Sequence, residues 1–303
     1  MLTNLKNFLV RKSELDACLP DSEIERLHNK AKQSYNHFSE TIRKSSENMV
    51  GNLQSSIHGT GLDFEEYQPY QPGSDSRHIN WRTFAKTQQL YINIYTEDKR
   101  PSTYLLFDQR EDMYFATRKQ LKIKLALNFA VYTIFCSLYQ QKAISGVVLR
   151  DKAKWFPRYS NSGAFYSLVN DLNTSVDYRK KHTKKIALND VLNKLSLTPG
   201  TELILISDLH DMNDETIRIL NNLSSLYRIT ILQIQDPVES QLPERGLFKI
   251  KNNANQETLN VNCNDKTVRE SYIEHIAKKI ECYQQQCINM GIEHDLIMTT
   301  TDF

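Results

Sequence analysis

The sequence predicts an α/β protein built on a doubly wound, mostly parallel sheet with helices on both faces. From Ser102 onward, short apolar runs alternate with longer segments of helical periodicity. In Tyr104–Phe107, four large apolar residues follow one another, which is typical of a strand buried on both faces. A second run of this kind, Thr201–Ile206, is followed by aspartates, as the first is. Ligands of open α/β sheets collect beyond such strand ends, so these two ends are the best candidate site.

Composition limits the function classes. The 303 residues suffice for one large or two moderate domains, and 38 basic against 36 acidic residues give no case for a nucleic-acid binder. The longest apolar stretch, Leu125–Tyr139, is too short to cross a membrane. With no signal peptide at the start, the scattered cysteines are expected to be reduced thiols in a cytoplasmic protein. They are Cys18, Cys136, Cys263, Cys282 and Cys287.

The chain divides into three parts by composition. Residues 1–50 are expected to be helical, with a narrow apolar seam that includes Leu27 and Ala31 and packs either on its own domain or on a partner helix. Residues 51–100 read as a small antiparallel β element around the turn Pro72-Gly73, because Tyr91–Tyr95 alternates apolar and polar residues. Residues 101–303 form the α/β domain, with a hairpin at about 246–261.

Within the α/β domain, each element follows from its pattern. The segment 117–141 is apolar nearly all round and predicts a buried helix. Pro199-Gly200 closes one helix, and Asn213 is a candidate cap of another. Further strands are expected at 144–149, 154–157, 229–234 and 294–298, a hairpin from 246–250 and 257–261, and helices at 164–172, 186–195 and 267–290.

Three stretches together resemble the domain-of-unknown-function 58 family, whose core is a von Willebrand factor type A (vWA) domain. The first, Gly59–Lys86, contains the signature residues Gly73, Asp75, Arg77 and Trp81. The second is the strand end at Asp108 with the buried helix after it, and the third is D-P-V-E-S-Q-L-P-E-R-G at 236–246. The resemblance implies a vWA-like, Rossmann-like sheet and the soluble branch of the family. We expect Trp81 to anchor the small β element on the sheet domain.

A vWA metal site uses D-x-S-x-S, and here the run is Asp108-Gln109-Arg110-Glu111-Asp112, so both serines are missing. We therefore expect a degenerate metal-ion-dependent adhesion site (MIDAS) without a cofactor. In it, Arg110 would pair with a neighbouring aspartate, Asp108, Asp112 or Asp208. If Mg²⁺ did bind, its ligands would be these three aspartates. The predicted partner-binding face is Asp108, Arg110, Asp112, Asp208 and Asp211.

The resemblance implies a non-enzymatic interaction module that works with a MoxR-type AAA+ ATPase in the chaperone-like maturation of a client protein. One alternative is a Mg²⁺-dependent vWA ligand-binding protein. Another is a phosphoesterase that uses Asp108, Asp208 and His210. No G-x-S-x-G elbow, H-E-x-x-H motif or phosphate-binding P-loop occurs in the sequence. We therefore expect a protein that is not an enzyme.

Overall fold

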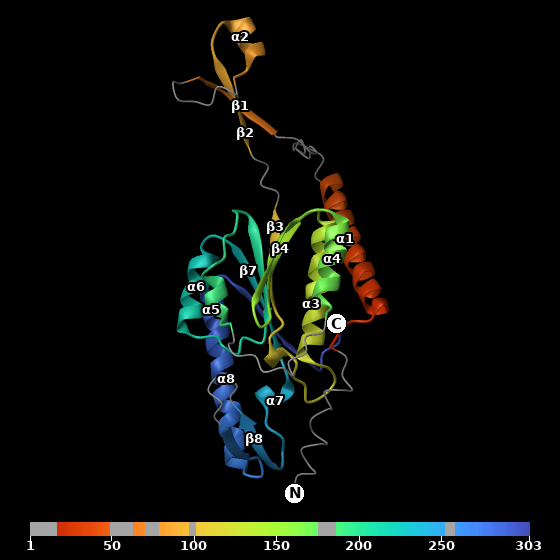
Figure 1. The fold of residues 1–303 in the computed structure, drawn as a ribbon, viewed down its shortest axis with the longest axis vertical. Coiled ribbons are helices and arrows are strands. Elements are labelled where there is room, and N and C mark those ends of the chain that lie inside the picture. The colour runs from red at the N-terminus through yellow and green to blue at the C-terminus, as the bar shows by residue number, and fades with distance from the viewer. Residues whose placement is uncertain (1–16, 49–62, 71–78, 97–100, 175–185, 252–257) are drawn as a thin grey trace. The chain divides into compact units, whose positions relative to one another are not determined.

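The computed structural model describes residues 17–48, 63–70, 79–96, 101–174, 186–251 and 258–303 (Figure 1). Its contacts divide the chain into two compact units. Unit 1 comprises Met1–Glu40 and Pro101–Phe303, and unit 2 comprises Thr41–Arg100. The N-terminal helical segment therefore belongs, through residue 40, with the α/β unit.

Unit 1 is built on a six-stranded sheet in the order β10-β7-β6-β3-β4-β5. All neighbouring pairs are parallel except β4 with β5. Numbered as the chain visits them, the strands read 3-2-1-4-5-6, so the chain winds outward in both directions from β3 and the switch point lies between β3 and β6. The predicted doubly wound sheet is confirmed. The strands are β3 (Ser102–Asp108), β4 (Ala143–Leu149), β5 (Ala153–Tyr159), β6 (Thr201–Ser207), β7 (Arg228–Gln235) and β10 (Glu293–Met298).

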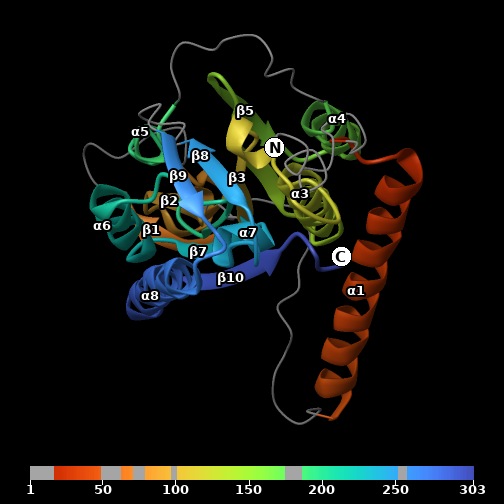
Figure 2. The same ribbon diagram turned by 90° about the horizontal axis from the view of Figure 1, so that it is seen from below.

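Helices cover both faces of this sheet (Figure 2). Leu105 and Phe107 of β3 point into one apolar core, while Tyr104 and Leu106 point into the other. This alternation explains why β3 is buried along its whole length. The first core is covered by α1 (Asp21–Asn48), α3 (Lys122–Tyr139) and α4 (Ser162–Leu172), and the second by α5 (Leu188–Leu192), α6 (Asp214–Ser224) and α8 (Lys266–Asn289).

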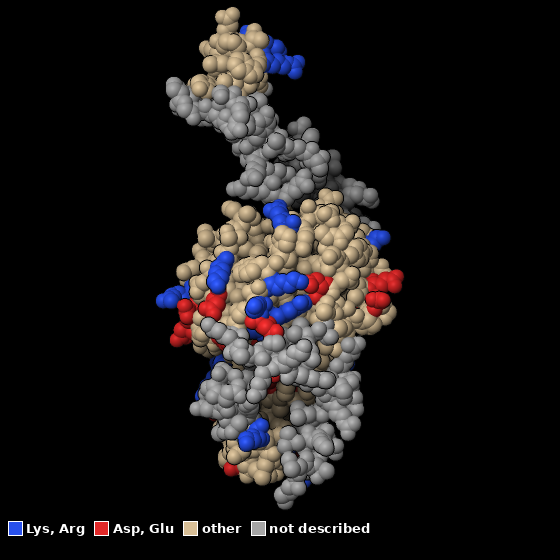
Figure 3. Space-filling model, in the orientation of Figure 1, with Lys and Arg blue, Asp and Glu red and all other residues tan. Residues whose placement is uncertain are grey.

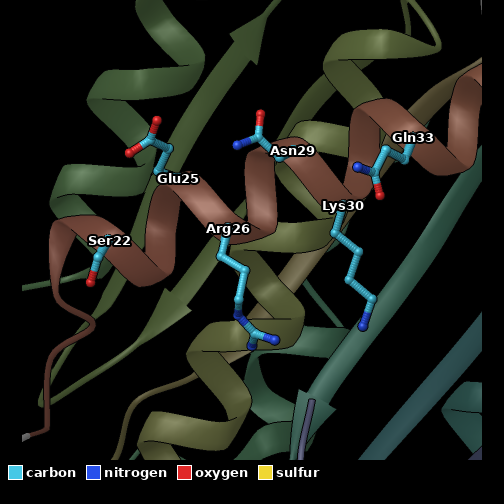
Figure 4. Close-up of a pocket in the computed structure, with 6 residues that line it drawn as sticks. All are labelled: Ser22, Glu25, Arg26, Asn29, Lys30 and Gln33. Carbon is cyan, nitrogen blue, oxygen red and sulfur yellow. The ribbon is translucent and has the colours of Figure 1, made fainter.

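Helix α1 docks on its own unit. Leu27 and Ala31 are buried in the first core, as the predicted seam requires. The guanidinium of Arg26 donates to the carbonyl oxygen of Phe303 at 3.1 Å, and the ammonium of Lys30 lies 4.1 Å from the Phe303 ring centroid. Figure 4 shows both cations on one side of a polar pocket along α1, lined by Ser22, Glu25, Arg26, Asn29, Lys30 and Gln33.

One predicted boundary is wrong. Helix α3 begins at Lys122 rather than at residue 117, and Glu111–Met113 forms a 3₁₀ helix before it. The reason lies outside the helix: the amide and hydroxyl of Thr117 both donate to the carboxylate of Asp236 on the far side of the switch point. That pair of bonds holds residue 117 in a loop. The predicted hairpin is confirmed as β8 (Leu247–Lys251) and β9 (Thr258–Asn262).

The two edge strands of the sheet differ in sequence. Strand β5 carries Pro157 and exposed Lys154 and Arg158, and it pairs antiparallel with β4. Strand β10 carries exposed Glu293 and Asp295 and pairs in parallel with β7.

Unit 2 contains the predicted antiparallel pair, β1 (Asp63–Pro69) with β2 (Tyr91–Thr96). It also contains a helix that the sequence did not predict, α2 (Trp81–Thr87), capped by the side chain of Asn80. Trp81 is 64% exposed. Gly73, Asp75 and Arg77 lie outside the described residues.

Candidate functional site

Charged side chains gather where β3 and β6 end, at the switch point of the sheet. Strand β3 ends at Asp108 and β6 at Ser207, with Asp208 following directly. Leu209 then takes up the left-handed conformation, with φ of 55°. A leucine in this conformation costs on the order of 1 kcal/mol. The turn that results leaves Asp208 facing one cation of the site and Asp211 facing another.

The first cation is Arg110, which pairs with Asp108 and Asp211. Its Nε and Nη2 donate to the two oxygens of Asp108 at 2.9 and 2.7 Å. Its Nη1 and Nη2 donate to the two oxygens of Asp211 at 2.6 and 3.0 Å. The remaining Nη1 hydrogen is directed at the carbonyl oxygen of Ile186, 3.0 Å away. All five guanidinium N–H donors are therefore used, in the fork geometry that favours arginine over lysine.

Asp108 is completely enclosed, with a side chain 1% exposed. Besides Arg110, the hydroxyl of Ser207 donates to it at 2.6 Å, and the backbone N–H of residue 110 donates at 3.0 Å. Ser207 therefore ties the end of β6 to the end of β3. We call Asp108, Arg110, Asp211 and Ser207 the arginine cluster.

The second cation is Lys122, at the first residue of α3. Its ammonium lies 2.9 Å from an oxygen of Asp208 and 2.7 Å from an oxygen of Glu239, and its side chain is 1% exposed. Glu239 lies in α7 (Pro237–Ser240), where its other oxygen accepts from the amide of Asp236 in a capping box. We call Lys122, Asp208 and Glu239 the lysine cluster.

Burial and attraction compete in both clusters. Burial acts to raise the pKa of Asp211, but hydrogen bonds and attraction from Arg110 outweigh it, so this pKa lies below its ordinary value. For Glu239 burial prevails over attraction by Lys122, and its pKa is raised. Burial disfavours the charged form of Lys122, but Asp208 and Glu239 together raise its pKa, so it is an ammonium at neutral pH.

These residues do not fit a resident Mg²⁺. The ion requires carboxylate oxygens at about 2.0–2.1 Å in octahedral geometry. Both oxygens of Asp108 accept bonds from Arg110, and one oxygen of Asp208 accepts from Lys122 while the other accepts from the amide of His210. Within the described part of the chain, no group of three or more His, Cys, Asp or Glu side chains is placed to hold a metal ion.

Some of the predicted site residues contact one another in the structure, and others do not. Arg110 pairs with Asp108, as one of the predicted possibilities had it, but its other partner is Asp211 rather than Asp112 or Asp208. Asp112 lies in the 3₁₀ helix beside the cluster, and none of the five donors of Arg110 reaches it. The imidazole of His210 is on an exposed residue.

Sequence reasoning missed the lysine cluster, although signals for it exist. Lys122 stands near the start of an otherwise apolar helix, where a buried charge needs a partner. Asp236 and Glu239 belong to the third stretch of the family resemblance, where they had been given no role in the site. Asp236 is completely buried and accepts bonds from Thr117 and Thr299, so it joins the lysine cluster to β10.

The fold and the ion pairs place the chain in a general class of protein. It is a doubly wound α/β protein in which an arginine and a lysine of the chain itself pair with the carboxylates at the switch point. The particular family follows from a sequence model. The model described as "Protein of unknown function DUF58" matches residues 66–281, more than half of the chain, and the chain belongs to this family.

The chain is also similar to mycobacterial proteins whose names state no function. The chain is 21% identical over 192 residues to the uncharacterized protein Rv1480 of Mycobacterium tuberculosis and equally to Mb1516 of Mycobacterium bovis. The match covers 63% of this chain and 60% of each relative, so the chain spans less than two thirds of their length.

Two solved structures show a distant likeness. One is the conserved hypothetical protein BatB from Bacteroides thetaiotaomicron, with a TM-score of 0.39 and 11% identity over 63% of this chain and 98% of that one. The other is an aerotolerance-related membrane protein from Bacteroides fragilis, with a TM-score of 0.38 and 14% identity over 66% and 91%. In the described part of our chain, no helix combines the length and the apolar character that a membrane span needs.

Proposed function

We propose that this chain is a non-enzymatic protein-interaction module, a partner or adaptor of a MoxR-type AAA+ ATPase in the chaperone-like maturation of a client protein. The observation that carries the proposal is the arginine cluster. It stands at the switch point, where α/β proteins bind ligands, and a built-in guanidinium neutralises the aspartates there. In this proposal the domain is a vWA-like module whose adhesion site has become independent of metal.

The arrangement favours recognition over chemistry. Asp108 and Asp208, which a phosphoesterase would need as a nucleophile or a metal ligand, each accept hydrogen bonds from a protein cation. A carboxylate held in this way is a poor nucleophile. The parts of the site that meet solvent are Asp211, with a side chain 30% exposed, Glu239, at 32%, and the exposed Glu111. These carboxylates offer a partner a fixed pattern of acceptors.

The test uses the full chain and a purified MoxR-type AAA+ ATPase from the same genome. The ATPase is first loaded with nucleotide, and the module is treated separately with EDTA or with Mg²⁺. We expect the two proteins to form a complex in size-exclusion chromatography equally well after either treatment. Charge reversal at the rim, Glu111→Arg with Asp211→Arg, should abolish it. Arg158→Glu on the distant strand β5 is the matched control and should leave it unchanged.

Absence of any complex would reject the ATPase as the partner. A complex that survives the rim reversals would move the contact away from the switch point. Calorimetry with MgCl₂ and MnCl₂ alone separates the metal-dependent alternative, since saturable heat that is lost in Asp108→Ala would contradict a metal-free site. Turnover of a generic phosphoester that is lost in His210→Ala would contradict the non-enzymatic assignment.

A further inference from the structure

Unit 2 exposes an aromatic pair on α2. Trp81 is 64% exposed and Phe84 is 37% exposed, and their rings meet edge to face with centroids 6.2 Å apart. Leu90, just after the helix, is 37% exposed. None of the residues of α2 is buried. Adjacent exposed rings on a short helix mark an interaction surface, because isolated surface aromatics need no explanation but a contiguous group does.

Trp81 packs little against the described part of its own unit, whereas Phe84, 37% exposed, is more covered. The helix is held at its ends by polar contacts, with the side chain of Asn80 accepting from the amide of Thr83 and Gln88 taking the left-handed conformation at the other end. The two-stranded ribbon below it is of a size that is marginally stable by itself. Because 64% of Trp81 is exposed, its ring has apolar surface available for an occupant.

The charges on α2 itself select the occupant, since the acidic residues of the two-stranded ribbon, Asp63, Glu65 and Glu66, are on strand β1. The segment 79–96 contains two basic residues, Arg82 and Lys86, and no aspartate or glutamate. Both are exposed, and at about 100° per residue they project roughly 100° and 140° around the helix axis from Trp81, so they form a basic face next to the aromatic one. Figure 3 shows Lys and Arg side chains at this end of unit 2, beside the uncharged surface. Cations next to aromatic rings complement an anionic surface that also has an apolar layer.

We propose that Trp81, Phe84, Arg82 and Lys86, which we call the α2 tip, dock on an anionic lipid surface. The indole ring combines an apolar body with an N–H donor and prefers the boundary between headgroups and acyl chains. Lysine and arginine near it are attracted to acidic headgroups. A seven-residue helix offers no groove that would hold an acidic peptide, whereas a fluid headgroup layer adapts to a projecting surface. The α2 tip belongs to unit 2 and the arginine cluster to unit 1, and the inference is independent of the proposed function.

Tryptophan fluorescence of the full chain tests the proposal, because the protein has two tryptophans. Trp155→Phe leaves Trp81 as the only reporter, and Trp81→Phe leaves Trp155, a 44% exposed residue of β5, as the matched control. The probe is vesicles of phosphatidylcholine with about 30 mol% phosphatidylserine, against phosphatidylcholine alone. We expect a saturable blue shift only for the Trp81 reporter, only with phosphatidylserine, and weakened by salt.

Charge reversal sharpens the result. In the Trp155→Phe background, Arg82→Glu with Lys86→Glu should raise the lipid needed for half-saturation by at least about tenfold. Arg158→Glu with Lys194→Glu, which reverses two exposed cations of unit 1, should leave it unchanged. All four positions are exposed, and circular dichroism checks that each variant folds.

Three outcomes would overturn the inference. Blue-shifted Trp81 emission in buffer alone would mean that the rest of the chain covers the α2 tip. An equal response from the Trp155 reporter would mean that adsorption is not specific to this tip. A shift with a soluble glutamate-rich peptide, and none with vesicles, would assign the surface to an acidic protein segment.

Discussion

The two ion-pair clusters at the switch point contain similar groups and are assembled in different ways. In the arginine cluster the cation and its first partner, Arg110 and Asp108, are two residues apart, and the guanidinium side chain is 11% exposed. In the lysine cluster the cation comes from α3, 86 positions away from Asp208, and is 1% exposed. The Arg110–Asp108 pair is local to one strand end and is completed by Ser207 and Asp211 beyond the neighbouring strand, while the lysine cluster joins the sheet to α3 and α7. The switch point is therefore stabilised by two cations, of which Arg110 lies near the protein surface and Lys122 is buried.

Removal of the buried cation should have the largest effect. Lys122→Met leaves Asp208 and Glu239 facing each other without compensation, and we expect it to lower the free energy of unfolding by about 3–5 kcal/mol. Urea denaturation measures this. Lys142→Met, which breaks the half-exposed pair with Glu202, is the control and should cost less than about 1 kcal/mol. Equal losses in the two variants would contradict the distinction between the clusters.

Loss of the guanidinium should cost less. Arg110→Met strands the enclosed Asp108, while Asp211 is partly exposed and can be rehydrated, so we expect a loss of about 2–3 kcal/mol. Arg110→Lys should recover less than half of it, because an ammonium cannot donate to two carboxylates and the Ile186 carbonyl in the same geometry. Full recovery by lysine would show that charge alone, without the fork of donors, holds the cluster.

The hydroxyl between the strands should contribute a smaller amount. Ser207 donates to Asp108 and accepts from the amide of Leu209, and it is completely buried. Ser207→Ala removes both bonds, and we expect a loss of about 1–2 kcal/mol in the same denaturation assay. Ser225→Ala, at an exposed hydroxyl that bonds the carbonyl of Asn222, serves as the control and should stay within about 0.5 kcal/mol of the parent.

The pH dependence should be the most subtle difference and has opposite signs in the two clusters. The depressed pKa of Asp211 gives stability that is complete above the unfolded-state pKa of about 3.9 and is lost as the pH falls through the folded-state value. The raised pKa of Glu239 gives stability below the unfolded-state value, near 4.3, that is lost as the pH rises through the folded-state value. Asp211→Asn should therefore reduce the loss of stability that occurs as the pH falls below about 3.9. Glu239→Gln should reduce the loss of stability that occurs as the pH rises above about 4.3. A reduced loss in the same direction of pH change in both variants would contradict the assignment.

The sequence predicted the pairing of Arg110 with Asp108 because the evidence for it is local. A charged run directly after an unbroken apolar strand can be recognised without any knowledge of distant contacts. It also predicted the sheet and most helices, since a strand such as β3 and a cap such as Asn213 depend on neighbouring residues. The lysine side depends on where α3 begins, and Thr117 is held out of that helix by Asp236, far along the chain. Periodicity does not report such a contact.

The helix α2 was missed for a related reason. None of its seven residues is buried, so no apolar stripe marks the helix. Its start is marked by Asn80, whose side chain accepts a hydrogen bond from the amide of Thr83. Trp81 was expected to anchor the small β element on the sheet domain, and the structure shows it 64% exposed. Its exposure is therefore informative, and it turns a residue assigned to packing into a candidate contact.

The ends of the sheet have a consequence for behaviour at high concentration. On β5, Pro157 lacks an amide hydrogen, and Lys154 and Arg158 add repelling charge, so another strand meets a poor template there. On β10, Glu293 and Asp295 place negative charge at the opposite end. Two β5 edges brought together would therefore meet like charge and a proline on each side. Strand β5 thus opposes the joining of two sheets through this edge.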